Sequence, residues 1–290
     1  MTREEFRILI EEKGPVLLDG GTGSCLRTRG MPAGVCTEQW VFDHPEVIKG
    51  LQEEYADAGS QIIYAPTFGG NRISLKNMGL ADQAEELNRT LAGRAVADLR
   101  GRVFVAGDLS TTGTPMEPYG PMTYGGLMEV YKEQICFLVE AGVDLLVAET
   151  LLSLDEALVI CDAAREICAL PLMVSFSCEA DGKLYFGGTA ADAAASLEAL
   201  GVDAVGVNCS VGPEQLEAVI RQLRDTVSIP ILAKPNAGMP VITDTGKAVY
   251  SMGAEEFARH MQRLWNCGAS LIGGCCGTTP DYIREIRKIL

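Results

Sequence analysis

The sequence is poor in histidine, in basic clusters and in long apolar runs, and each shortage excludes a class of function. Only two of the 290 residues are histidines, His44 and His260, which rules out a histidine-rich metal site. The chain has 24 lysines and arginines but 39 acidic residues, and its basic residues form no run. This composition argues against nucleic acid as the main partner. No apolar stretch approaches the roughly 20 residues of a membrane span. Because the first residues carry charges of both signs with no apolar stretch behind them, we expect no signal peptide and a cytoplasmic protein.

Cysteine, in contrast, is abundant, with ten residues. In a reducing compartment these residues are expected to be thiols, metal ligands or catalytic groups rather than disulfides. Because histidine is scarce, any tight transition-metal site in this chain must rely on sulfur.

A repeated pattern predicts the fold. Polar helical stretches end in a small residue and glycine, as at Ala141-Gly142, and a short apolar run follows. This order is typical of a loop that leads into a buried parallel strand. Eight such runs occur, at 15–19, 61–65, 102–107, 144–148, 172–177, 204–208, 230–233 and 270–273. Helices are predicted at 45–58, 81–99, 127–141, 153–168, 190–200, 213–226 and 254–267. Eight βα units predict an α/β protein with a single domain over residues 1–290, a (β/α)8 TIM barrel. A doubly wound open sheet is the alternative, because alternation alone does not prove closure.

The predicted connections are asymmetric. Those after the first, third and seventh strands are long, at 20–44, 110–126 and 234–253, whereas those before the strands are short. In such a barrel the loops that follow the strands build the active face, so we expect substrate walls and a lid there. Four apolar residues of the second loop either form a lid over a methyl donor or pack as ordinary loop residues: Met116, Tyr119, Met122 and Tyr124.

Acidic residues, cysteines and other polar residues stand at the carboxyl ends of the predicted strands. The acids Asp19, Asp108 and Glu149 follow the first, third and fourth strands. The sixth strand ends at Asn208-Cys209, the seventh runs into Lys234-Pro235-Asn236, and the eighth leads to Cys275-Cys276. In a barrel, three cysteines and three acids would therefore surround one mouth. The other seven cysteines fall in loops, helices or apolar surroundings and are expected to be small buried hydrophobes: Cys25, Cys36, Cys136, Cys161, Cys168, Cys178 and Cys267.

Three thiolates with an open position are what a catalytic zinc site needs, and thiolates select zinc over hard ions. The glycines on both sides of Cys275-Cys276 allow the backbone to turn so that both sulfurs approach one point. Spacing alone leaves other interpretations open. They are a redox pair of vicinal cysteines, three unrelated buried thiols, or a phosphate site before a final helix that starts at Pro280 and is capped by Thr279.

These motifs also carry a family resemblance. Val-Asn-Cys-Ser at 207–210, followed by Gly-Gly-Cys-Cys-Gly-Thr at 273–278, resembles the zinc signature of the homocysteine S-methyltransferase family. Asp-Gly-Gly-Thr-Gly at 19–23 and Val-Ala-Glu-Thr at 147–150 resemble its substrate-binding segments, and 235–240 resembles the loop after its seventh strand. The segment 65–69 is similar to its Thr-Asn-Thr-Phe motif, with Pro66 in place of the asparagine. The resemblance spans nearly the whole chain and is greatest to the homocysteine-binding module of cobalamin-dependent methionine synthases.

The resemblance implies a zinc-dependent methyltransferase that converts homocysteine to methionine on a (β/α)8 barrel. The residues that it implies for the site fall into two groups. Zinc and catalysis would depend on Cys209, Cys275 and Cys276. The amino group of homocysteine would be held by Asp19 and Glu149, aided by backbone groups near Gly20, while Asn236 would lie beside the metal and take its fourth position when substrate is absent.

The methyl donor is expected to be methylcobalamin on a separate corrinoid protein. The chain has no room for a folate barrel and a corrinoid domain, and it lacks an Asp-x-His-x-x-Gly motif. Betaine is disfavoured, because Cys36 and Gly69 stand where betaine-using relatives have aromatic residues. Alternatives are S-methylmethionine or S-adenosylmethionine as donor, another thiol or a selenol as acceptor, and a non-catalytic module that docks a corrinoid protein.

Overall fold

The computed structural model describes residues 1–243 and 248–290, so positions 244–247 of the predicted loop 234–253 lie outside the described residues. Within them, eight parallel strands form one sheet in the order β1-β10-β7-β6-β5-β4-β3-β2. A parallel bridge between Leu18 and Ile62 joins the first strand to the second, and the Gln61 amide donates to the Leu17 carbonyl at 2.7 Å. The sheet is therefore closed. The predicted barrel is confirmed, and the open doubly wound alternative is wrong.

The strands are β1 (Val16–Leu17), β2 (Ile62–Tyr64), β3 (Phe104–Leu109), β4 (Leu145–Leu151), β5 (Leu172–Phe176), β6 (Ala204–Asn208), β7 (Ile231–Lys234) and β10 (Ala269–Ile272).

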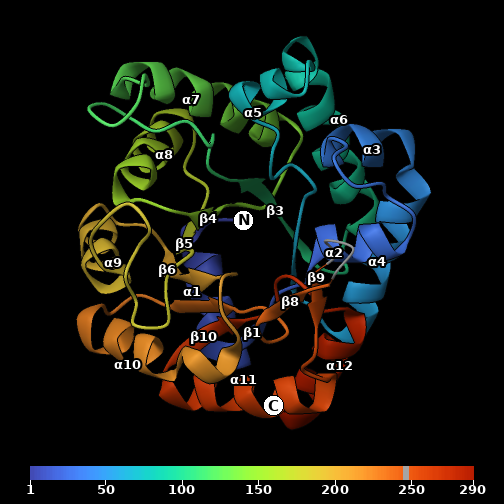
Figure 1. The fold of residues 1–290 in the computed structure, drawn as a ribbon, viewed down its shortest axis with the longest axis vertical. Helices are drawn as coiled ribbons and strands as arrows, with labels where there is room; N and C mark the ends of the chain where they lie inside the picture. The colour runs from blue at the N-terminus through green and yellow to red at the C-terminus, as the bar shows by residue number, and fades with distance from the viewer. Residues whose placement is uncertain (244–247) are drawn as a thin grey trace.

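Helices surround the sheet (Figure 1). Those predicted between strands are present: α4 (Pro45–Ala58), α6 (Ala84–Leu99) after a short 3₁₀ turn at Ala81–Gln83, α7 (Tyr124–Glu140), α8 (Leu154–Ile167), α9 (Ala190–Ala199), α10 (Glu217–Thr226) after a turn at Pro213–Gln215, and α11 (Ala254–Cys267). The final helix α12 (Pro280–Ile289) starts where predicted, although the Thr279 side chain makes no capping hydrogen bond. Four helices were not predicted: α1 (Arg3–Lys13), α2 (Thr22–Thr28), α3 (Thr37–Asp43) and α5 (Arg72–Asn77).

The core has two layers, as parallel strands buried on both faces require. One cluster fills the barrel interior with residues such as Leu18, Val147 and Met173, and Phe6 of α1 packs against it. A larger cluster lies between the sheet and the helices. Packing is tight at Gly206 of β6, where a Cβ atom would lie 1.9 Å from the Leu232 carbonyl oxygen.

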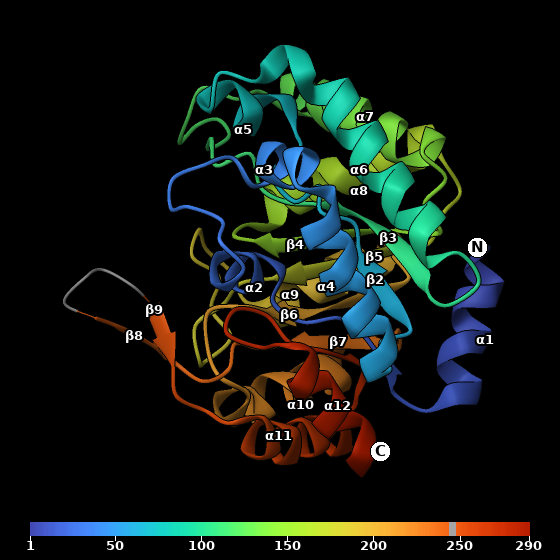
Figure 2. The same cartoon turned by 90° about the vertical axis from the view of Figure 1, so that its right-hand side faces the viewer.

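The carboxyl ends of the strands open on the face shown in Figure 1, whereas α1 covers the opposite end (Figure 2). The predicted long loops on this face hold unpredicted structure. The first contains α2 and α3, and the third contains an antiparallel hairpin of β8 (Pro240–Ile242) and β9 (Ala248–Tyr250), which projects from the barrel in Figure 2. The strand boundaries differ from prediction by one to three residues except in β6, and β3 and β4 extend past Asp108 and Glu149. Among the described residues, no helix is both long and apolar enough to cross a membrane.

Candidate active site

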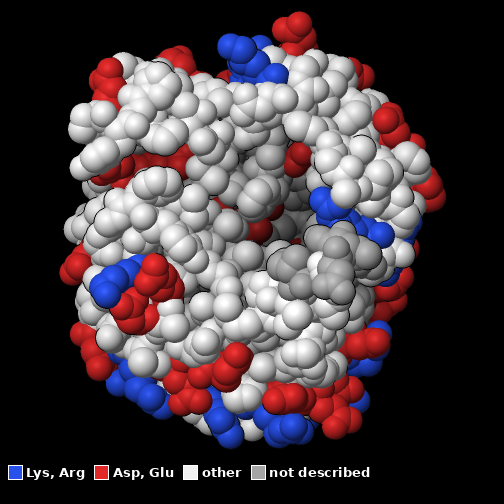
Figure 3. Space-filling model, in the orientation of Figure 1, with Lys and Arg blue, Asp and Glu red and all other residues white. Residues whose placement is uncertain are grey.

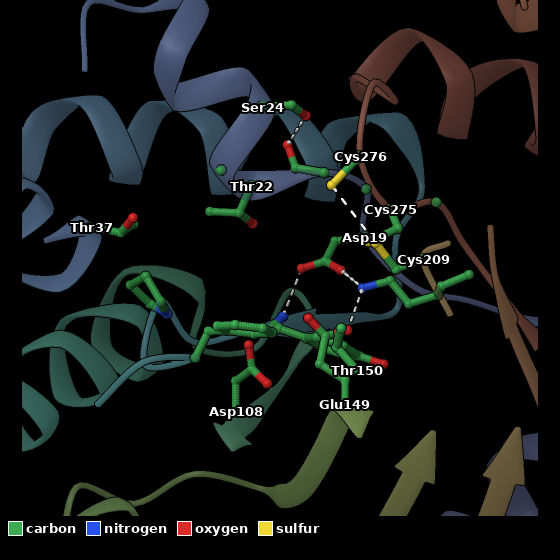
Figure 4. Close-up of a pocket in the computed structure, with 18 of the residues that line it drawn as sticks. Asp19, Thr22, Ser24, Thr37, Asp108, Glu149, Thr150, Cys209, Cys275 and Cys276 are labelled. Carbon is green, nitrogen blue, oxygen red and sulfur yellow. Dashed lines mark hydrogen bonds and ion pairs between the residues drawn. The ribbon is translucent and has the colours of Figure 1, made fainter. Parts of the chain in front are cut away.

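Three cysteines from two distant segments meet at the mouth of the barrel (Figure 4). The sulfur atoms of Cys209, Cys275 and Cys276 all lie within 4.8 Å of one another, and the Cys209 and Cys276 sulfurs are 4.0 Å apart. All ten cysteines of the chain, which lie within the described residues, are free thiols. No other trio of histidine, cysteine or acidic side chains in the described part of the chain gathers closely enough to hold a metal ion.

The backbone at Cys209 is in a sparsely populated conformation. Cys209 and Ser210 follow β6 with φ angles of 60° and 55°, in the left-handed region that non-glycine residues rarely adopt. The Cys209 amide donates to the Lys234 carbonyl at 3.0 Å, and its own carbonyl accepts from the Val211 amide at 2.7 Å. Such a conformation costs of order 1–3 kcal/mol and is typical of functional sites, where it aims a side chain.

The loop after β10 presents the other two sulfurs. Gly274 donates to the Asp19 carbonyl at 3.0 Å and Cys275 donates to the Pro235 carbonyl at 2.8 Å, so the loop is tied to the ends of β1 and β7. Gly277 has a φ angle of 84°, and a Cβ atom there would lie 2.3 Å from the Tyr250 ring. Only glycine therefore allows this loop to turn beneath Tyr250.

The pKa values of the three cysteines differ from one another. Hydrogen bonds with Cys209 and Cys275 lower the pKa of Cys276 to about 3, and a further hydrogen bond with Tyr250 of β9 acts in the same direction. The hydrogen bond to Cys275 lowers the pKa of Cys209, but the bond to Cys276 and burial outweigh it and raise that pKa to about 12. Hydrogen bonds to both neighbours, together with burial, raise the pKa of Cys275. Three sulfurs within 4.8 Å of one another form a donor set whose protons a soft dication can displace.

Asn236, predicted beside the metal, lies on a segment attached to this loop. Its neighbour Ala237 donates to the Cys276 carbonyl at 3.0 Å, and the Asn236 amide donates to the Val211 carbonyl at 3.0 Å. The Asn236 side chain is buried, and its Oδ1 atom has no hydrogen-bond partner among the described residues. A buried acceptor without a partner is costly, so this oxygen suits a ligand role.

Asp19, at the end of β1, forms a buried ion pair that the sequence did not reveal. Lys234 Nζ, from the end of β7, lies 2.6 Å from Asp19 Oδ1 and 4.0 Å from Glu149 Oε2. The ammonium also lies 3.6 Å from the centre of the Tyr64 ring, and the Tyr64 amide donates to Asp19 Oδ2 at 2.8 Å. Burial alone would lower the pKa of Lys234, but the Asp19 carboxylate, with Tyr64 and Glu149, outweighs burial and raises it.

Two further acids face the same space from β3 and β4. Burial raises the pKa of Glu149 to about 7; Lys234 opposes this rise and Asp19 adds to it. Burial and then the Glu149 charge raise the pKa of Asp108 well above its usual range, and Asp108 Oδ1 has no hydrogen-bond partner. Glu149 Oε2 accepts a long hydrogen bond of 3.4 Å from Asn208 Nδ2. Among the described residues, therefore, no cation lies within hydrogen-bond distance of either acid.

The three sulfurs and the acids line one cavity of about 290 Å³, small enough to suit an amino-acid-sized ligand. Figure 3 shows the hollow with acidic side chains deep inside it, and Figure 4 places Asp19 between the cysteines and the pair Asp108 and Glu149. Gly20 also lines it, and a Cβ atom there would lie 2.6 Å from the Tyr55 hydroxyl. Glu38, which the sequence did not single out, lines the same cavity and accepts the Gly69 amide at 2.6 Å.

The apolar residues considered as a lid lie elsewhere. Met116 and Met122 pack against the main core, Tyr119 is 85% exposed, and Tyr124 hydrogen-bonds to Asp162. None of the four lines the cavity. Ordinary loop packing describes the two methionines, and the lid interpretation is not supported. The seven remaining cysteines also lie outside the sulfur cluster.

Comparisons with known proteins find similarity over most of the chain. The family model described as homocysteine S-methyltransferase matches residues 16–290. Over 266 residues the chain is 32% identical to proteins named methionine synthase from Mycobacterium leprae and from Mycobacterium tuberculosis; the match covers 87% of this chain and 22% of each relative. Among solved structures, the homocysteine methyltransferase MmuM from Escherichia coli has the same fold. Its oxidized form gives a TM-score of 0.83 and its metallated form 0.80, each at 23% identity over 98% of this chain and 99% of that one.

Proposed function

Because the chain belongs to the homocysteine S-methyltransferase family of methyltransferase enzymes, we propose that residues 1–290 act as one domain that transfers a methyl group to the sulfur of homocysteine and forms methionine. The observation that carries this proposal is the meeting of three free thiols within 4.8 Å at a cavity that also holds Asp19 and Glu149. The chain spans only about a fifth of the length of the curated relatives that it matches (22%), so its substrate and partners are inferred from the site.

The cluster of Cys209, Cys275 and Cys276 fits Zn²⁺. Three sulfur donors at one point, with one position left open, are the ligand set of a catalytic zinc site. Asn236, whose neighbour Ala237 is hydrogen-bonded to Cys276, would supply the oxygen at that position in the absence of substrate. Zinc in such a site makes a coordinated thiol a thiolate at neutral pH, where a free thiol with a pKa of about 8.5 is mostly protonated. This supply of thiolate explains how a site without histidine can activate a thiol.

The residues of the chain then bind and orient the substrate. Asp19 and Glu149 place acidic side chains in the part of the cavity that would receive its ammonium group, and the backbone near Gly20 lines the same cavity. Holding the sulfur in a fixed direction toward the mouth makes attack on an incoming methyl group effectively intramolecular.

The donor that we propose is a methylcorrinoid carried by a separate protein. The exposed large hydrophobic residues of the described chain include several from the loops at the mouth: Phe68, Tyr185, Phe186, Met239, Val241 and Val249. Apolar residues gathered around a site entrance suit contact with another protein or with a large apolar group.

One observation favours a second donor class. Among the described residues that line the cavity, four are acids, Asp19, Glu38, Asp108 and Glu149, and one is a lysine, Lys234, so this excess of acidic groups favours a cationic ligand. A sulfonium donor such as S-methylmethionine or S-adenosylmethionine carries that charge. The two donor classes are distinguished only by assay.

The test is methionine formation by zinc-loaded protein from homocysteine and each of four donors: free methylcobalamin, methylcobalamin on a separate corrinoid protein, S-methylmethionine and S-adenosylmethionine. We expect turnover with at least one donor. The Cys209→Ser variant should lose it, and the Cys136→Ser variant, altered outside the cluster, should keep it. If no donor supports methionine formation, or if Cys209→Ser turns over like the parent protein, the proposal fails.

A further inference from the structure

The position expected for the substrate ammonium already contains an ammonium group of the protein. Asp19 and Glu149 are the acids to which the resemblance assigns the substrate amino group, yet Lys234 Nζ lies between them. The side chains of Lys234 and Asp19 are only 3% and 2% exposed, so this pair is part of the buried structure.

Both oxygen atoms of Asp19 already have a short, buried partner. Its Oδ1 receives Lys234 at 2.6 Å and its Oδ2 receives the Tyr64 amide at 2.8 Å. The Tyr64 ring lies 3.6 Å from the ammonium and holds it from a third side. A second ammonium at Asp19 would have to displace Lys234 or lie beside it. Two like charges about 4 Å apart at an effective dielectric of about 20 weaken binding by roughly 1,000-fold.

Glu149, in contrast, has no short hydrogen bond or ion pair with the described residues. Its Oε2 lies 4.0 Å from Lys234, beyond a normal hydrogen bond, and accepts only the 3.4 Å bond from Asn208. Its carboxyl group lines the cavity, as does Asp108, whose Oδ1 has no partner. Of these two cavity acids, Glu149 rather than Asp19 is therefore the one that no described residue engages through a short hydrogen bond or ion pair.

We propose that Lys234 reserves Asp19 as its own counter-ion, so that Glu149 recognises the substrate ammonium and Asp19 acts only as a positioning residue. This division of roles rests on the proposed function, and it makes Lys234 a specificity determinant. Without Lys234, Asp19 would become a second acceptor for the substrate ammonium.

The test compares homocysteine with 4-mercaptobutyrate, which has the same thiol and carboxylate but no amino group. The ratio of the two kcat/KM values, and the ratio of the two Kd values from calorimetry, measure recognition of the ammonium. We expect Glu149→Gln to lower both ratios by roughly 100-fold, the size of one lost hydrogen bond between charged groups. Asp19→Asn alone would free Lys234 to pair with Glu149, which lies 4.0 Å away, so the role of Asp19 is measured in the double variant Asp19→Asn with Lys234→Met. That double variant should change the ratios by less than about tenfold.

Lys234→Met should raise the ratios, because it frees Asp19 for the substrate. If this variant does not fold with a buried unpaired carboxylate, the double variant Asp19→Asn with Lys234→Met removes both charges and should keep ratios near those of the parent protein. The inference is overturned if the double variant lowers the ratios as much as Glu149→Gln does, or if Lys234→Met lowers them. If neither thiol is methylated by any donor, the proposed function fails, whereas the calorimetric ratios still decide the role of Lys234.

Discussion

Replacing Glu149 by glutamine should change how the stability of the protein depends on pH. Burial raises the pKa of this carboxyl from 4.5 to about 7, against the opposing effect of Lys234. Because the pKa in the folded state lies above that in the unfolded state, folding favours the protonated form. Below about pH 4.5 both states are protonated and the group has no effect on stability. The destabilisation grows as pH rises from 4.5 to 7 and is complete above that range.

The size of the effect follows from the same two pKa values. At about 1.4 kcal/mol for each pKa unit, the rise from 4.5 to about 7 corresponds to roughly 3 kcal/mol of unfolding free energy. Glutamine keeps the shape of the side chain but carries no proton that titrates. Part of the effect is already present at pH 5, so the free energy of unfolding of Glu149→Gln should exceed that of the parent protein by roughly 2–3 kcal/mol more at pH 8 than at pH 5.

The assay is denaturant unfolding of substrate-free protein at several pH values between 5 and 8, followed by circular dichroism. Glu255→Gln, at an exposed position of α11, is the matched control and should follow the parent protein across the whole range. If the difference between Glu149→Gln and the parent protein is the same at pH 5 and pH 8, Glu149 is not the buried acid described above, and the electrostatic account of the cavity is wrong.

Three further predictions concern the site and the barrel. Cys209→Ser should bind far less zinc than Cys136→Ser while both give a native circular dichroism spectrum; equal zinc contents would remove Cys209 from the ligand set. The preference for homocysteine over 4-mercaptobutyrate should fall about tenfold for each pH unit below 7, because protonated Glu149 cannot pair with an ammonium, and a pH-independent preference would argue against that pairing. Gly206→Ala should lower the thermal midpoint by several degrees or prevent folding, because its Cβ would lie 1.9 Å from the Leu232 carbonyl oxygen; an unchanged midpoint would show that the strands move apart at little cost.

Much of the barrel could be predicted because its signals are local. A glycine that ends a helix, followed by an apolar run, marks each αβ unit regardless of what lies beside it in space. The helix predicted at 45–58 has those same bounds in the structure, and the strand at 204–208 does as well. Closure is different, because it depends on the pairing of Leu18 with Ile62, which no local pattern contains.

The sulfur cluster was predictable for a similar reason. The cysteines lie at strand ends, and the barrel topology places all strand ends at one mouth. The ion pair of Asp19 with Lys234 was not predictable, because the two residues are 215 positions apart in the sequence. In the sequence, Lys234 only follows a predicted strand. Tyr250 was also missed, because a short hairpin in a long loop carries no strong periodic signal before it packs over Gly277.

X-ray absorption at the zinc edge tests the central claim most directly, because it counts the sulfur atoms around the metal. For protein purified with zinc we predict about one zinc per chain with three sulfur neighbours near 2.3 Å, and four when homocysteine is added. A protein that binds no zinc, or that binds it through fewer than three sulfurs, would contradict the assignment of Cys209, Cys275 and Cys276 as the metal site.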